Sequence, residues 1–466
     1  MTSEAYGNPA LEIGGVNDEM PTKGHKNMDY LHDSHRSMFA KLLPSAIGAM
    51  LSETVASLID TIILSHYLGP DMLSTISICM PIYMFVNTLS MLIVSGGATL
   101  FAQSLGREDR EDAQRYYTCS IVLMVLCGAV LTVTGLVFTE PIMTLLGASG
   151  SVLAPTVLYG RVLFAFMIPL CLYQQLMVYV RFDGAPILSL ISTVVCAVVN
   201  LVLDVLFVGV FEWGPGGAAL ATCLAYTVAM LINAAHLLQK NNGLIFRRRS
   251  MGKARVGRVL KTGIPLSVTQ LGMAVGTSLF NIRIMEVGGP MHLDVYGVIT
   301  QLSVVAMALY EGIAQACQPI LAACFGAGDR KRTAETIRYG FVMEIIAMTF
   351  ATLAYIFGAG FVANLFSMRE PEIHAAAVGA IRIYALSLLF TGFNTIIIYH
   401  FQVKERELHA TGISLLSGTI LPVVFLYLLT LLFSVSGIWW CWLIAQGLTL
   451  ILSAVLYTRD KRMDSH

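Results

Sequence analysis

Charged residues are scarce in this 466-residue chain, where they make up 12% of the sequence. Soluble globular domains carry about 25%. Hydrophobic residues make up 56%, which is more apolar surface than a soluble fold hides behind so few charges. Lys and Arg together number 29, as do Asp and Glu, so there is no basic excess of the kind that binds nucleic acid. The composition excludes a disordered chain, a coiled coil and a nucleic-acid binder, and it predicts an integral membrane protein.

Disulfides are not expected either, because the nine cysteines are an odd number and most lie inside apolar runs. We interpret them as small buried hydrophobic residues. The first 35 residues are polar and lack the apolar core of a cleavable signal peptide. Residues 1–36 are therefore predicted to be a flexible cytosolic tail.

Twelve apolar runs are long enough to cross a bilayer, whose core requires about 20 helical residues. The runs are continuous and do not alternate, so they exclude a spanning β-barrel. We predict an all-α integral membrane fold with twelve transmembrane helices in two pseudo-symmetric six-helix bundles and a central cleft. The expected parts are the N-lobe with helices 1–6 (residues 37–240), a cytosolic interlobe loop (241–258), the C-lobe with helices 7–12 (259–458) and a cytosolic tail (459–466).

The distribution of Lys and Arg indicates the orientation in the membrane. If the termini and the loops on their side face the cytoplasm, that side holds nearly all of the 29 basic residues. Arg181, at the end of the predicted fourth helix, is counted on the cytoplasmic side. The exceptions are Arg161, Arg283, Arg369 and Arg382. Both termini are therefore predicted to be cytoplasmic.

The two halves of the chain repeat each other at an offset of about 220 residues. Residues 105–110 match 325–330, and residues 57–60 match 278–281. Six helices per half is an even number, so both copies keep the same orientation in the membrane, as in several transporter folds. Two such bundles can rock to open a cleft to either side, although duplication alone can also reflect ancestry only.

Carboxyl groups within the apolar runs are few and costly, so they usually serve a function. In the first helix Glu53 and Asp60 are seven residues apart and share one face, as do Asn200 and Asp204 in the fifth helix. Thr222 lies in the sixth helix. If Asp60, Asn200, Asp204 and Thr222 converge, their oxygens can hold Na⁺, or the two carboxyl groups can share a proton. The alternative is that both aspartates are neutral and only hydrogen-bond between helices.

The second half has a different distribution of acidic residues. Asn281 replaces Asp60 at the matched position, and residues 411–457 contain no carboxylate. Glu311 can face the central cleft, whereas we expect Glu344 to snorkel toward the membrane surface. The acidic chemistry is therefore predicted to lie in the first half.

Several motifs, taken in order, resemble those of the multidrug and toxic compound extrusion (MATE) family over about residues 40–455. They are Ile59-Asp60-Thr61-Ile62-Ile63 with Tyr67-Leu68-Gly69; Gly96-Gly97-Ala98; Leu105-Gly106-Arg107-Glu108-Asp109; Asn200-Leu201-Val202-Leu203-Asp204 with Gly216-Gly217-Ala218-Ala219-Leu220-Ala221-Thr222; Gly263-Ile264-Pro265; and Gln318-Pro319-Ile320 with Phe325-Gly326-Ala327-Gly328-Asp329.

This resemblance implies an antiporter in a bacterial inner membrane that expels cationic or amphipathic organic compounds, driven by entry of H⁺ or Na⁺. It implies a coupling-ion site at Asp60, completed in one branch by Asn200, Asp204 and Thr222. Another branch uses carboxylates in the seventh and tenth helices, where this chain has Gln270, Met273 and Asn394. We expect a substrate cleft among Glu53, Ser57, Gln270, Met273, Asn281, Glu311 and Asn394.

No cofactor is expected besides the coupling ion, and the expected partners are small drug-like compounds and membrane lipid, with the protein a monomer. A flippase for lipid-linked oligosaccharides is the main alternative, although it would require a more basic cleft. A channel is a further alternative, and a flux assay would separate it from an exchanger. A membrane enzyme is not expected, because no HExxH, GxSxG or Walker A motif occurs.

Overall fold

The computed structural model describes residues 28–68, 70–239, 242–248, 250–366, 368 and 370–463, which form helices joined by short loops without any strand. Most of the predicted tail 1–36, the end of the tail 459–466 and Arg369 lie outside these residues. The N-lobe contains α1 (His35–Leu68), α2 (Pro70–Gly106), α3 (Arg110–Val137), α4 (Thr139–Leu145), η1 (Gly150–Val152), α5 (Leu153–Ala165), α6 (Met167–Phe182), α7 (Pro186–Asp204), η2 (Val205–Val210), α8 (Gly214–Ala234) and η3 (Ala235–Leu238). The C-lobe contains α9 (Lys253–Gly326), α10 (Arg330–Leu365), α11 (Pro371–Val403), α12 (Glu407–Leu415), η4 (Leu416–Ile420), α13 (Leu421–Phe433) and α14 (Val435–Met463).

Helix boundaries differ by a few residues from the predicted part boundaries. Helix α9 begins at Lys253, inside the predicted interlobe loop 241–258, and α14 continues to Met463, inside the predicted tail 459–466. Both extensions are polar ends of apolar helices, so the apolar run alone underestimates the helix.

The number of membrane spans agrees with twelve once two breaks are considered. Ten helices of the described chain are long and apolar enough to cross a membrane, and α5 and α6 form a further span that bends by 52°. Helix α9 has 74 residues, or about 110 Å, which is far more than one bilayer crossing. At Gly289 its backbone is non-helical (φ 68°, ψ −171°), and the following Pro290 has no N–H to continue the helix. Helix α9 therefore supplies two spans.

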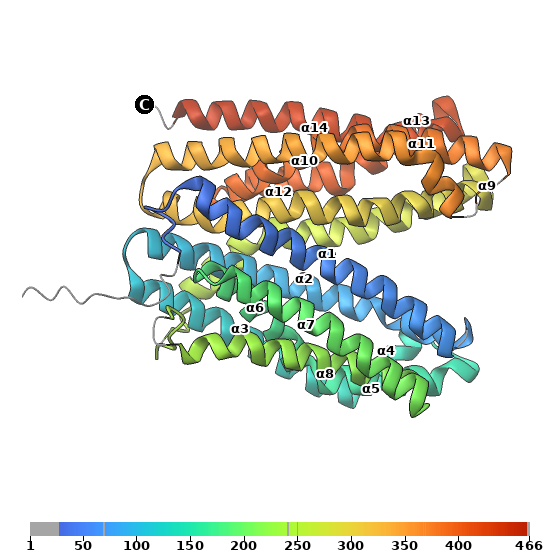
Figure 1. Cartoon of the computed structure of the whole chain (residues 1–466), viewed down its shortest axis with the longest axis horizontal. Helices are drawn as coiled ribbons and strands as arrows, with labels where there is room; N and C mark the ends of the chain where they lie inside the picture. The colour runs from blue at the N-terminus through green and yellow to red at the C-terminus, as the bar shows by residue number, and fades with distance from the viewer. Residues whose placement is uncertain are drawn as a thin grey trace, which may run out of the picture.

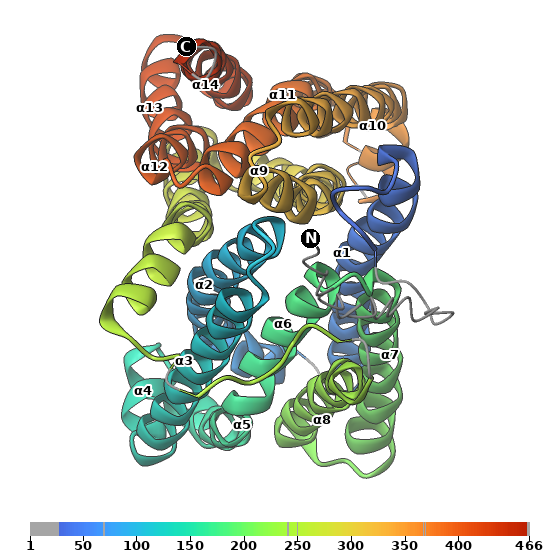
Figure 2. The same ribbon diagram turned by 90° about the vertical axis from the view of Figure 1, so that its left-hand side faces the viewer.

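The helices form two groups, α1 to α8 and α9 to α14, which approach each other at the end that carries the described termini and diverge at the other end (Figure 1). Seen from the terminal end, α3 to α8 lie on one side and α11 to α14 on the other, with α2 between them (Figure 2). The main buried apolar cluster joins both lobes, with Phe101 of α2 packed among Ile320 of α9 and Phe401 of α11.

The sequence repeat corresponds to a repeated turn. After α2, Asp109 caps α3 by accepting a hydrogen bond from the backbone N–H of Asp112 (2.9 Å). After α9, Asp329 caps α10 by accepting one from the N–H of Arg332 (2.8 Å). The turns match in their backbone hydrogen bonds as well, so the two halves fold alike at this point.

Polar contacts hold the lobes together at the terminal end. Gln103 Nε2 of α2 donates to the carbonyl oxygen of Val403 in α11 (2.6 Å). Gln318 Nε2 of α9 donates to Thr99 Oγ1 of α2 (3.1 Å). These bonds connect side chains and backbone across the interface between the lobes.

Two glycines make a reciprocal contact at the same interface. A Cβ on Gly106 of α2 would overlap the carbonyl oxygen of Ala323, and a Cβ on Gly326 of α9 would overlap that of Gln103. The two helix backbones can approach this closely only because both residues lack a side chain.

Each lobe also has an acid–histidine pair at this end. In the N-lobe, Asp183 follows α6, and its Oδ2 lies 2.8 Å from His236 Nε2 in η3. In the C-lobe the histidine is His400 of α11, and its Nε2 lies 3.3 Å from Asp460 Oδ2 in α14. Lys404 Nζ lies 2.6 Å from the same oxygen. The two pairs lie at corresponding places in the lobes, but the residue types are exchanged. The acid follows α6 in the N-lobe, whereas the corresponding helix α11 of the C-lobe carries the histidine.

Candidate functional site

Four polar side chains from three N-lobe helices meet inside that lobe: Asp60 of α1, Asn200 and Asp204 of α7, and Thr222 of α8. Asn200 Nδ2 donates to Asp204 Oδ2 (2.7 Å) and lies 3.4 Å from Thr222 Oγ1. The carboxyl groups of Asp60 and Asp204 are neighbours and interact with each other. The structure thus brings together the four residues that the sequence suggested as a coupling-ion site.

Local backbone structure positions this cluster. Asp204 is the last residue of α7, directly before the π-helical segment η2. π-helical turns within α-helices are frequent at functional sites. The four-residue spacing of Asn200 and Asp204 places both on one face, and Asp204 is 0% exposed.

Two oxygens of the cluster lack a hydrogen-bond partner. Oδ1 of Asp60 and Oδ1 of Asp204 are both buried and make no hydrogen bond to any described residue. Such a group costs about 1–3 kcal/mol when left unpaired. A proton, or a hard cation that takes oxygen ligands, would satisfy them, so these residues fit either ion.

An N-lobe cavity of ≈320 Å³ reaches this cluster. Glu53, Ser57 and Asp60 line it from α1, opposite Asn200 and Thr222. Polar aromatic and amide side chains form much of the remaining wall: Tyr83, Asn87, Tyr159, Tyr173, Gln174 and Tyr226. Asp60 therefore belongs both to the four-residue cluster and to the wall of this cavity.

A second cavity of ≈90 Å³ is lined by residues of both lobes. Four residues of the predicted substrate cleft line it: Gln270, Met273, Glu311 and Asn394. Asn394 Nδ2 donates to Gln446 Oε1 (3.0 Å), and Glu311 Oε2 accepts from Tyr399 Oη (2.9 Å). Asn281 is different, because it lies on an exposed part of α9 and lines none of the cavities described here.

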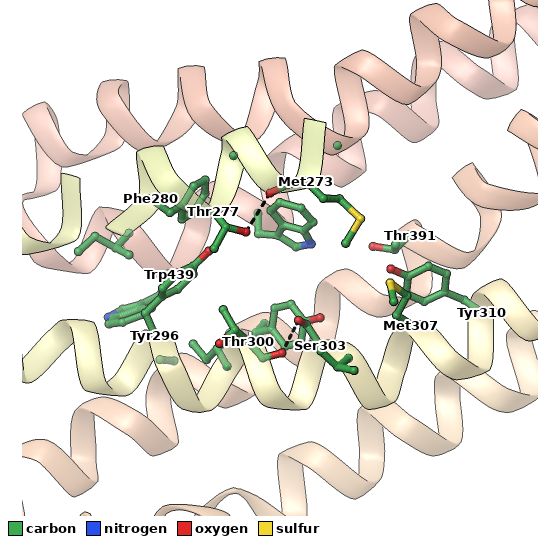
Figure 3. Close-up of a pocket in the computed structure, with 18 residues that line it drawn as sticks. Met273, Thr277, Phe280, Tyr296, Thr300, Ser303, Met307, Tyr310, Thr391 and Trp439 are labelled. Atoms are coloured by element: carbon green, nitrogen blue, oxygen red, sulfur yellow. Dashed lines mark hydrogen bonds between the residues drawn. The ribbon is translucent and has the colours of Figure 1, made fainter. Parts of the chain in front are cut away.

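A third cavity of ≈150 Å³ lies within the C-lobe and is aromatic (Figure 3). Six rings line it: Phe280, Tyr296, Tyr310, Tyr384, Trp439 and Trp442. Met273 and Met307 lie toward the same end as Tyr310 (Figure 3). Its described lining contains no carboxylate, so it offers ring faces and thioethers where the N-lobe cavity offers acids.

A sequence model of the MatE family matches residues 45–206 and 265–449, one match in each lobe. The chain belongs to this family. Among curated relatives, a multidrug export protein MepA of Staphylococcus haemolyticus is 27% identical over 435 residues, covering 92% of this chain and 94% of that protein. The MepA of Staphylococcus saprophyticus is 26% identical over 420 residues, covering 89% and 91%.

Solved structures show the same fold. A MATE in complex with MaL6 superposes with a TM-score of 0.88 at 21% identity, covering 95% of this chain and 100% of that one. A MOP superfamily transporter from Pyrococcus furiosus superposes with 0.86 at 22% identity, covering 94% and 98%. The predicted two-lobed all-α fold is confirmed.

Family membership also confirms the class of function. As a MATE protein the chain is a multi-pass transporter of the cell membrane and belongs to the multidrug efflux transporters. It is a secondary transporter and not an enzyme, since that is the activity of its family.

One sequence-based expectation was wrong. Glu344 does not snorkel, because α11 covers it and it is 1% exposed. Arg181 lies at the end of the fourth span, as predicted, but in the last turn of α6 it is only 2% exposed. The hydroxyl of Tyr30 donates to the carbonyl oxygen of Arg181 (2.9 Å), and the guanidinium of Arg181 donates to Gln315 Oε1 of the other lobe (2.7 Å).

The tyrosines of the N-lobe cavity and the rings of the C-lobe cavity were not predicted from the sequence. Their only signal was aromatic residues inside apolar spans, which packing against lipid or neighbouring helices also explains. The basic residues that a diphosphate-binding flippase would use, Arg161, Arg283 and Arg382, line none of the three cavities.

Proposed function

We propose that this MATE transporter exports cationic or amphipathic organic compounds in exchange for H⁺ or Na⁺, by alternating access of a cleft between the lobes. The names of its relatives, which are multidrug export proteins, support small organic substrates. The acidic N-lobe cavity and the aromatic C-lobe cavity support them too, because carboxylates and ring faces both attract organic cations.

The pairing of Asp60 and Asp204, each with one unpartnered buried oxygen, carries this proposal. Asp60 also lines the N-lobe cavity beside Glu53. Binding of a proton or Na⁺ at the pair removes negative charge from the cavity wall. An organic cation bound there is then held less tightly and leaves.

The contact between the lobes at one end supports alternating access. Rocking would break a small set of bonds, such as Gln103 to Val403, and open the terminal end. Each positive charge that moves inward across 100 mV contributes about 2.3 kcal/mol. This energy drives export only if the ion binds the two states with different affinity.

The excess of Lys and Arg at the terminal end supports cytoplasmic termini, so the structure is assigned the outward-open state. One chain supplies both lobes, which supports a monomer surrounded by membrane lipid. The coupling ion is the sole non-substrate ligand in this proposal.

The test uses proteoliposomes with either a pH gradient or a Na⁺ gradient imposed alone. We expect one gradient to drive efflux of an organic cation in the wild type. Asp60→Asn abolishes this drive, whereas the matched C-lobe variant Asn281→Ala keeps it. Ion-driven efflux by Asp60→Asn at the wild-type rate would contradict the proposal.

A further inference from the structure

The strap, residues 28–34, directly precedes α1 at the terminal end of the molecule. Met28 and Tyr30 of the strap are 7% and 6% exposed, and both belong to the buried apolar cluster that joins the two lobes. A segment outside the transmembrane helices is thus packed into the interface between the lobes.

Helix α10 of the C-lobe holds this strap by its backbone. Arg332 Nε donates to the carbonyl oxygen of Tyr30 (3.0 Å), and Nη2 of the same guanidinium donates to the carbonyl oxygen of Asp33. One rigid guanidinium group therefore fixes two carbonyl groups of the strap. One turn along α10, Thr336 Oγ1 lies 3.0 Å from Nε2 of His35, the first residue of α1. The strap is attached to the C-lobe, although the helix that follows it belongs to the N-lobe.

One side chain of the strap reaches helix α6 of the N-lobe. Tyr30 Oη donates to the carbonyl oxygen of Arg181 in the last turn of α6 (2.9 Å). The other described hydrogen bonds of the strap are internal, lead into α1 or come from α10. The end of α6 is thus connected to the C-lobe through the strap, and also directly through the bond from Arg181 to Gln315.

Opening of the terminal end would move α6 away from α10, and the strap can then remain with only one of these two helices. Arg332 holds it by two hydrogen bonds from a charged donor, whereas α6 accepts one bond from a neutral hydroxyl group. Hydrogen bonds from charged donors are the stronger ones. The bond between Tyr30 and Arg181 is therefore the one that breaks.

We propose that the strap is a latch that keeps the lobes packed at the terminal end, and that Tyr30 is the positioning residue that ties α6 to the C-lobe through Arg332. When the lobes separate there, the Tyr30 hydroxyl leaves Arg181 and the strap stays on α10. The latch rests on the alternating access proposed above, but lobe separation is measured without an ion gradient or a substrate. Failure of the ion site at Asp60 is therefore seen separately, in the efflux assay.

Distances between spin labels in the purified full-length protein test the latch. Leu238→Cys in η3 and Leu408→Cys in α12 provide two exposed sites in different lobes, and the native cysteines are buried or half-buried. Tyr30→Phe should increase the ratio of separated to packed molecules about fivefold, or about 1 kcal/mol, through loss of one hydrogen bond. The carbonyl oxygen of Arg181 keeps its bond to the N–H of Gly184 (3.2 Å), so this variant should fold. An unchanged ratio in Tyr30→Phe would overturn the proposal.

A double variant tests whether Tyr30 and Arg332 act as one connection. Arg332→Gln releases the strap from α10, so it should raise the ratio by at least the same factor as Tyr30→Phe. Adding Tyr30→Phe to Arg332→Gln should change nothing more, because the connection is already broken. Lys331→Gln, which removes an exposed charge from the neighbouring position of α10, should keep the wild-type ratio. Additive effects of the two substitutions, or a wild-type ratio in Arg332→Gln, would overturn the latch.

Discussion

The two lobes have similar backbones but hold their acidic groups in different places. In the N-lobe, the acids lie on the first helix and at the π-helical segment, as Asp60 and Asp204. In the C-lobe, Asn281 matches Asp60, and the acids are Glu311 and Glu344 on other helices. The two lobes therefore share their helix geometry, whereas the charged groups that give each lobe its chemistry lie at different positions.

The shared geometry includes irregular features. Each lobe has a π-helical segment within its fifth span, η2 (Val205–Val210) and η4 (Leu416–Ile420). The first is preceded by Asp204 and the second by Leu415. The same backbone irregularity is therefore present with a carboxylate in one lobe and without one in the other.

Moving the carboxyl group from position 60 to position 281 tests whether the two lobes are interchangeable, and it has the largest expected effect. The double variant Asp60→Asn with Asn281→Asp should remain on the order of 100-fold below the wild type in ion-driven efflux, a deficit of about 2.8 kcal/mol. The reason is that Asn281 is exposed and lines none of the cavities described here. Efflux in proteoliposomes measures this. Recovery of wild-type coupling in the double variant would mean that the lobes are interchangeable.

The reciprocal glycines test what the lobes have in common. Gly106→Ala and Gly326→Ala should each weaken packing at the terminal end by about 1–3 kcal/mol, because each added Cβ overlaps a backbone oxygen. The two variants should have equal effects. Cross-linking of cysteines placed across this interface reports the fraction of packed molecules. A large effect from one glycine and none from the other would show that the contact is not symmetric.

The smallest expected effect concerns the aromatic C-lobe cavity, which we expect to affect substrate binding but not ion coupling. Trp439→Ala removes one ring of the C-lobe cavity, and we expect an increase in KM for an aromatic cation of about fivefold, or about 1 kcal/mol. The ion dependence of transport should not change, because no carboxylate lines that cavity. Efflux kinetics at several substrate concentrations measure both. A loss of ion coupling in Trp439→Ala would refute the separation of roles.

The sequence predicted the fold and the N-lobe cluster for clear physical reasons. Helical spacing puts Asn200 and Asp204 on one face, and the cost of a carboxyl group in a membrane singles out Asp60. It did not predict the burial of Arg181, which lies at a span end where polar residues usually reach water. It did not predict the burial of Glu344 either, because the sequence does not show which neighbouring helix covers it. It also did not separate the cavity tyrosines from lipid-facing aromatics, because periodicity does not indicate what a helix face contacts.

The exchanged acid and histidine at the terminal end have a consequence for assembly of the chain during synthesis. If helix α6 docked against α14, Asp183 would meet Asp460, and if α11 docked against η3, His400 would meet His236. Both mismatches lack the acid–base attraction of the native arrangement. In each half of the chain, this arrangement thus favours pairing between helices of the same half over pairing with helices of the other half.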